Sequence, residues 1–219
     1  LRKKGLSAAA KKSGRTATEG TITIELSADN KKATISEVNC ETDFVGQNEN
    51  FIEFCATTTA HIHTSGIKNV DELLASTING NAFSDHLSVT ISKIGENIVV
   101  RRFAEVSVGE NGSVSAYKHA NGKIGVIVAA ECDSAKTAEA VTGVLKDIAM
   151  HAAAMNPNYL DETEVPQEDL DREAEVAKAQ LEKEGKPAAM WDKIIPGKLV
   201  KFKKDNCLVD QPFVKDDKK

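Results

Sequence analysis

Polar and apolar residues alternate along residues 21–26, and this period of two predicts a half-buried β-strand. A turn over residues 28–31 leads to a second strand over residues 33–40, so the two runs predict a β-hairpin. The second strand alternates imperfectly, because Ile35 and Val38 have opposite parity. A β-bulge would account for this, at a position that the sequence does not fix.

The pattern then changes to a helical period. Residues 48–63 predict one helix, which Gly66 ends, and residues 70–94 predict two short helices. The positions that carry these patterns are Phe51, Phe54, Cys55, Thr58 and Ile62 in the long helix, and Val70, Leu73, Leu74, Phe83, Leu87, Ile91 and Ile94 in the short ones.

Strands return over residues 98–108, 113–120 and 123–130. Arg101 and Arg102 are adjacent in the first, so they should point to opposite faces, with at least one exposed or ion-paired. Asn121-Gly122 predicts a two-residue hairpin turn in which both residues have positive φ. The nearly all-apolar strand after it should be central and buried on both faces, with Gly125 allowing close backbone approach.

A long helix is predicted over residues 134–155, and an acidic helix follows between residues 161 and 184. Gly185-Lys186-Pro187 separates the acidic helix from a basic one, whose middle Pro196-Gly197 should disturb. Opposite charge favours an antiparallel hairpin, and ordinary packing of both helices on the core is the alternative. A 4-3-4 spacing typical of a coiled-coil seam joins Leu170, Ala174, Ala177 and Leu181.

The order strand, hairpin, strand, charged turn and helix occurs twice, in residues 21–63 and 98–155. We therefore expect an α+β fold of two related subdomains of antiparallel strands packed with helices, plus an antiparallel helical hairpin. The expected parts are a basic helix or linker over residues 1–20, core subdomains over 21–95 and 96–160, the hairpin over 161–207, and a tail over 208–219.

Composition narrows the range of functions that the chain could have. The chain is 41% hydrophobic and 28% charged, as in soluble globular proteins, and its net charge of −5 disfavours a nucleic-acid binder. Its four dispersed cysteines predict free thiols in a reducing cytosol. No motif of a hydrolase, phosphate-binding loop or redox centre occurs, and His61 and His63 lie two apart on a predicted helix, so they should not share a metal. We expect neither an enzyme nor a cofactor.

The most unusual stretch is residues 39–46, which read as a turn that carries Phe44 beside Asp43. In one interpretation Phe44 folds into the core and Asp43 caps the next helix. In the other, both side chains are exposed and dock into a partner, because aromatic residues are favoured interface anchors.

Four motifs in order resemble the elongation factor Ts family: EVNCETDFV at residues 37–45, IGENIVVRR at 94–102, YKHA then GKIGV at 117–126, and DIAMHAAA at 147–154. The resemblance implies a nucleotide exchange factor for the GTPase elongation factor Tu. Phe44 would enter the GTPase near its Mg²⁺ site with Asp43 beside it. The other implied contacts are Thr42, Val45, Ile94, Gly95 and His119.

The resemblance further implies that the chain is a core fragment without the family's N-terminal three-helix module and C-terminal end. Expected partners are GDP-bound and nucleotide-free elongation factor Tu, with a homodimer as an additional possibility and no nucleic acid or membrane. The competing hypothesis is a structural module that dimerises through the helical hairpin over residues 161–207.

Overall fold

The computed structural model describes residue 7 and residues 9–216 of the chain. The chain divides into two compact units, residues 1–153 and residues 154–219. Mixed helices and antiparallel strands confirm the predicted α+β class. Each unit is described by itself.

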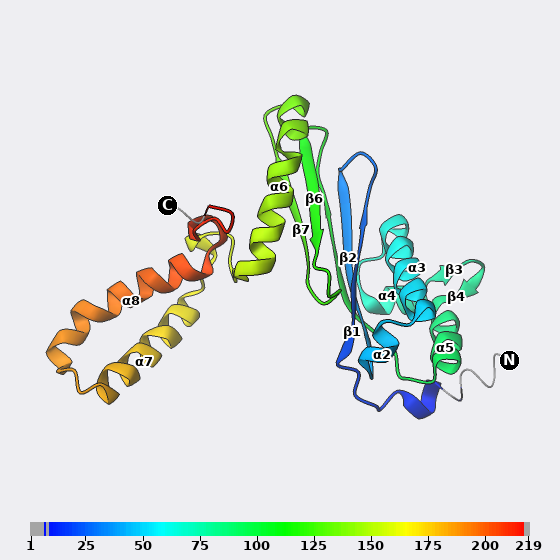
Figure 1. The fold of residues 1–219 in the computed structure, drawn as a ribbon, viewed down its shortest axis with the longest axis horizontal. Helices are drawn as coiled ribbons and strands as arrows, with labels where there is room; N and C mark the ends of the chain where they lie inside the picture. The colour runs from blue at the N-terminus through cyan, green and yellow to red at the C-terminus, as the bar shows by residue number, and fades with distance from the viewer. Residues whose placement is uncertain (1–6, 8, 217–219) are drawn as a thin grey trace. The chain divides into compact units, whose positions relative to one another are not determined.

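The first unit contains a three-stranded antiparallel sheet. It has the order β1-β2-β5, with β1 over Glu19–Leu26, β2 over Lys32–Cys40 and β5 over Val99–Ser107. A second sheet pairs β6, Gly112–Lys118, with β7, Gly125–Glu131, and contacts the first (Figure 1). A Cβ atom on Gly125 would lie 2.5 Å from Cγ2 of Ile22, so this glycine permits the close approach that the sequence predicted.

Helices accompany both sheets. The first sheet is contacted by α3, Glu49–Ser65, and by α4, Val70–Ala75, which in turn contacts α5, Phe83–Ile94. The second sheet is joined to α6, Ala135–Met155, through a 3.1 Å hydrogen bond between the Ser113 and Thr142 hydroxyls. All four helices were predicted, but a small hairpin of β3, Thr77–Ile78, and β4, Asn81–Ala82, was not.

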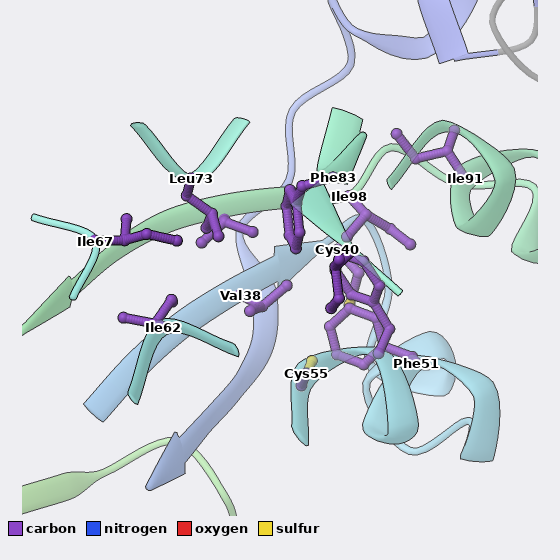
Figure 2. Close-up of a cluster of buried hydrophobic side chains, with 13 residues drawn as sticks. Val38, Cys40, Phe51, Cys55, Ile62, Ile67, Leu73, Phe83, Ile91 and Ile98 are labelled. Atoms are coloured by element: carbon purple, nitrogen blue, oxygen red, sulfur yellow. The ribbon is translucent and has the colours of Figure 1, made fainter. Parts of the chain in front are cut away.

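The core lies between β2, β5 and the helices α3 to α5. Figure 2 shows Val38 of β2 near Phe51 of α3, both fully buried, and Val100 of β5 belongs to the same cluster. The helical period found in the sequence supplies most of the other members, because its positions fall on one face of each helix. Members of the cluster include Cys40, Phe54, Cys55, Ile62, Leu73, Phe83, Ile91 and Ile98.

A bulge does not explain the opposite parity of Ile35 and Val38, because both faces of β2 are covered. Val38 faces the α3 side, in the core, whereas Ile35 lies on the opposite face near Gly125 of β7. A central strand covered on both faces needs apolar residues at both odd and even positions. The register does shift in the β2–β5 ladder, where Arg101 of β5 has no partner between Glu37 and Val38. Both Arg101 and Arg102 consequently reach the Glu37 carboxylate, at 3.5 and 2.7 Å.

Two predictions for the β6–β7 hairpin are also wrong. Its loop covers residues 119–124, with the His119 N–H donating to the Ile124 carbonyl at 2.9 Å, and only Gly122 has positive φ, at 71°. Asn121 therefore does not form the tight two-residue turn. The strand β7 is not central, because it pairs only with β6 among the described strands and is only partly buried.

The second unit contains the predicted helical hairpin. After η1, Glu162–Glu164, α7 spans Gln167–Lys183 and contacts α8, Trp191–Asn206; η2, Ala188–Met190, lies between them and η3, Leu208–Asp210, follows. Ala177 and Leu181 of the expected seam are buried. A coiled-coil geometry stays a prediction. Helix α8 continues through Pro196, so the expected disturbance does not end the helix and consists of the lost hydrogen bond to the Asp192 carbonyl.

Few ion pairs join the acidic and basic halves of this hairpin, although their opposite charge was predicted. Lys203 contacts Glu162 of η1 at 3.1 Å, and Lys198 donates to the amide oxygen of Gln180 at 3.0 Å. The remaining recorded ion pairs of α7 and α8 in the described residues lie within a helix. All four cysteines are free, and no helix of the described chain is long and apolar enough to cross a membrane.

Candidate partner-binding surface

The stretch that carries Phe44 is a single helical turn, α2, over Asp43–Gly46. Thr42 caps it, because its Oγ1 accepts a hydrogen bond from the Val45 N–H at 3.3 Å. Asn48 caps the following helix α3 by accepting from the Asn50 N–H at 3.0 Å. Two successive caps thus turn the chain sharply between β2 and α3.

Phe44 projects from this turn and is 84% exposed. The interpretation that it folds into the core is therefore wrong, and so is the cap assigned to Asp43, which is exposed. Val45 fills the inward position and packs against the core cluster. A largely exposed phenylalanine on a capped turn is typical of a protein-binding surface.

Ile94 and Gly95 end helix α5. Gly95 adopts a left-handed conformation, with φ of 90°, and donates its N–H to the Ile91 carbonyl at 2.8 Å. Ile94 is partly buried against the core, while Gly95 is exposed. The next residue, Glu96, accepts hydrogen bonds from residues 41 and 42, so this helix end lies directly against the α2 turn.

His119 lies in the exposed β6–β7 loop, and its Nδ1 is 3.0 Å from the Tyr117 hydroxyl. This loop is fixed to strand β1. The Ile22 N–H donates to the Gly122 carbonyl at 2.7 Å, and Lys123 contacts Glu19 at 2.6 Å. The Glu19 carboxylate, with a smaller contribution from Asp43, raises the pKa of the Lys123 ammonium.

Strand β1 also brings the loop to α2. Glu19 pairs with Cys40 in the β1–β2 register, and a Cβ atom on Gly46 would lie 3.7 Å from the Gly20 carbonyl oxygen. All seven predicted contact residues therefore lie at one end of the three-stranded sheet, where β1 begins and β2 ends (Figure 1). They come from three separate segments, so only the fold brings them together. What each residue binds stays a prediction.

Residues that sequence reasoning missed hold this end together. Glu41 and Glu96 each accept hydrogen bonds from the other's segment, and Lys123 fixes the β6–β7 loop. Their motifs were recognised in the sequence, but only the structure shows these contacts. Nothing within a motif distinguishes a residue that stabilises the surface through internal hydrogen bonds from one that is exposed on it.

The two histidines of the His-x-His pair contact different partners. His61 Nε2 lies 2.8 Å from the Ser76 hydroxyl, whereas His63 Nδ1 lies 2.9 Å from the Thr34 hydroxyl on β2. Across residues 9–216, no group of three or more His, Cys, Asp or Glu side chains is placed to hold a metal ion. The features that stand out at this end are a displayed aromatic side chain and ordered loops, which suit binding.

The chain matches a family of known proteins over most of its length. The profile of the family described as "Elongation factor TS" matches residues 41–219. The protein named elongation factor Ts of a Nitratiruptor species is 54% identical over 219 residues, covering 100% of this chain and 72% of that protein. Those of Nautilia profundicola and Clostridium novyi are 52% and 46% identical, covering 100% and 98% of this chain and 71% and 70% of theirs. The match includes every segment of the candidate surface.

Proposed function

The chain belongs to the elongation factor Ts family, and from that premise we propose that it binds the GTPase elongation factor Tu and promotes release of GDP. The observation that carries this proposal is the exposure of Phe44, 84%, on a turn that two caps and the Glu96 contacts hold in place. An aromatic anchor on a rigid support loses little conformational freedom when it binds, so more of its binding energy is available to deform the partner.

Exchange of this kind needs no covalent chemistry. A factor that binds the nucleotide-free GTPase more tightly than the GDP-bound form must weaken GDP binding by the same ratio. A thousandfold weakening corresponds to about 4 kcal/mol of differential binding. Burial of one aromatic side chain together with the loss of a metal contact in the partner is of that order.

In the proposed complex, Phe44 inserts into the GTPase near the Mg²⁺ that bridges the nucleotide phosphates. Displacing groups around that metal loosens the phosphates, because the metal neutralises their charge. Asp43 is exposed beside Phe44 and would bring a carboxylate towards the metal-binding groups, while Thr42 and Val45 support the turn. Ile94 with Gly95 and His119 would form second and third contacts at the same end of the sheet.

The direct test is the release of a fluorescent GDP analogue from elongation factor Tu with excess unlabelled GDP. Phe44→Ala should lower the stimulated release rate about 100-fold, since about 3 kcal/mol of anchor energy is lost. Its melting temperature should stay unchanged because Phe44 contributes little to the core.

Val144→Ala is a matched control, since Val144 is an apolar residue of α6 that is 55% exposed. It should leave the release rate unchanged. Normal stimulation by a folded Phe44→Ala variant would contradict the proposal.

A further inference from the structure

We propose that Glu41 and Glu96 form a reciprocal carboxylate clamp that positions Phe44, so that they act as positioning residues of the exchange reaction. This inference rests on the proposed function. The clamp joins two loops that are far apart in the sequence, residues 41–42 after β2 and residues 96–97 before β5. Each loop supplies one carboxylate, and each carboxylate binds the backbone of the other loop.

The hydrogen bonds are specific and numerous. Glu96 Oε2 accepts from the N–H groups of Glu41 and Thr42, both at 3.0 Å, and its Oε1 accepts from the Thr42 hydroxyl at 2.7 Å. In return, Glu41 Oε1 accepts from the N–H of Asn97 at 2.7 Å. Bonds to an ionised acceptor are stronger than those between neutral groups, so these four contacts fix both loops firmly.

Buried and charged neighbours complete the clamp. Asn97 is buried and donates its side-chain amide to the Arg15 carbonyl at 2.7 Å. The guanidinium of Arg15 lies 3.6 Å from Glu41 Oε1 and offsets part of the negative charge that the two carboxylates bring together. The segment before β1 therefore supports the clamp from a third side.

The α2 turn needs this support because it is only four residues long. A helical turn of that length does not persist alone, since nucleation fixes several dihedral angles for one hydrogen bond. Thr42 connects the clamp to the turn, because its hydroxyl donates to Glu96 and accepts from the Val45 N–H. Phe44 follows Thr42 by two residues, so the clamp sets the position of Phe44 through Thr42.

The clamp is tested with Glu96→Ala and Glu96→Gln in the release assay at varied concentrations of the factor. Glu96→Ala should lower the maximal release rate roughly 10- to 100-fold, as expected when a precisely placed contact is displaced by about 1 Å. Glu96→Gln should lose less, because its amide oxygen can accept both backbone N–H groups and its NH₂ can donate to the Thr42 hydroxyl. Val144→Ala again serves as the control.

A double-mutant cycle separates positioning from a general loss of structure. If Glu96 acts through Phe44, the double variant Phe44→Ala/Glu96→Ala should release GDP within about twofold of the Phe44→Ala rate. Amide hydrogen exchange should accelerate at Thr42 and Val45 in Glu96→Ala, while the amides of α3 keep their protection. If Glu96→Ala does not fold, the same cycle with Phe44→Ala is measured with Glu41→Gln and with Glu96→Gln in its place.

The outcomes distinguish the two proposals. An unchanged rate for Phe44→Ala would overturn the proposed function. A slow Phe44→Ala variant together with a fully active, folded Glu96→Ala variant would overturn the clamp alone. Equal further slowing by Glu96→Ala in both backgrounds would overturn it as well, because Glu96 would then act independently of Phe44.

Discussion

Two junctions of the first unit each lead from a hairpin strand into a long helix, but the connections between strand and helix differ. After β2 the chain makes the α2 turn before α3, whereas after β7 it passes through residues 132–134 directly into α6. At the second junction Ser134 caps the helix, accepting from the Thr137 N–H at 3.2 Å. No large apolar side chain of residues 131–134 is displayed there. The first junction has an extra turn, and Phe44 is on it.

The junctions also differ in their support. At the second, Glu131 accepts from the Gly109 N–H at 3.0 Å, and the Cys132 N–H donates to the Asn111 carbonyl at 3.1 Å. These bonds tie it to the turn between β5 and β6. At the first junction, the carboxylates of Glu41 and Glu96 each bind the backbone of the other's loop, so two distant loops hold each other. A simple cap suffices to start a helix, but holding an aromatic side chain in water requires additional fixed contacts.

The largest expected contrast is in thiol reactivity. Burial, followed by the charges of Glu96 and Glu19, raises the pKa of the Cys40 thiol to about 11, so at pH 8 about one molecule in a thousand is thiolate. Cys132 of the second junction is partly exposed. An aromatic disulfide reagent should therefore modify Cys132 at least about 100-fold faster than Cys40, because the Cys40 thiol is rarely ionised and is fully buried. In Cys132→Ser the fast phase should vanish; a fast phase that remains there and is lost when Cys40→Ser is added would show that the first junction opens readily.

A smaller contrast should follow from removing each cap. Thr42→Val abolishes both the cap of α2 and the hydroxyl bond to Glu96, so stimulated GDP release should fall about tenfold. Ser134→Ala removes a cap and a hydroxyl contact with Thr137, both outside the candidate surface, so it should lower the free energy of unfolding by about 1 kcal/mol and leave release unchanged. Urea unfolding and the release assay measure the two effects. Equal effects of the two variants on release would remove the distinction between the junctions.

The smallest expected effect concerns Gly46 at the end of α2. Its φ is not positive, and an added Cβ would have ordinary contacts, the nearest at 3.7 Å. Gly46→Ala should therefore raise the free energy of unfolding by about 0.4–1 kcal/mol through loss of entropy in the unfolded chain, with no loss of exchange. Gly20→Ala is the opposite control, because its Cβ would lie 2.1 Å from the Val38 carbonyl oxygen. A destabilised Gly46→Ala variant would show that the turn tolerates no added side chain.

Helices and paired strands were predictable where one local period dominates. The face of α3 containing Phe51 and Ile62 and the ends of that helix at Asn48 and Gly66 follow from spacing and capping chemistry alone. Prediction failed where burial depends on distant segments. The apparent fault at Ile35 and Val38 reflects coverage of both faces of β2, and the apolar run of β7 does not lie in the centre of a sheet.

The sequence by itself determined the family, the α+β class and the order of the elements, because motifs, periodicity and caps are local properties of the chain. It also singled out Phe44 and Asp43, but it left the choice between core and surface open. Only the tertiary structure decided that choice. Val45 takes the inward position, and the carboxylate of Glu96, 54 residues beyond Thr42, holds the turn that exposes Phe44. Contacts between such distant residues depend on how the sheet is assembled, which no local pattern encodes.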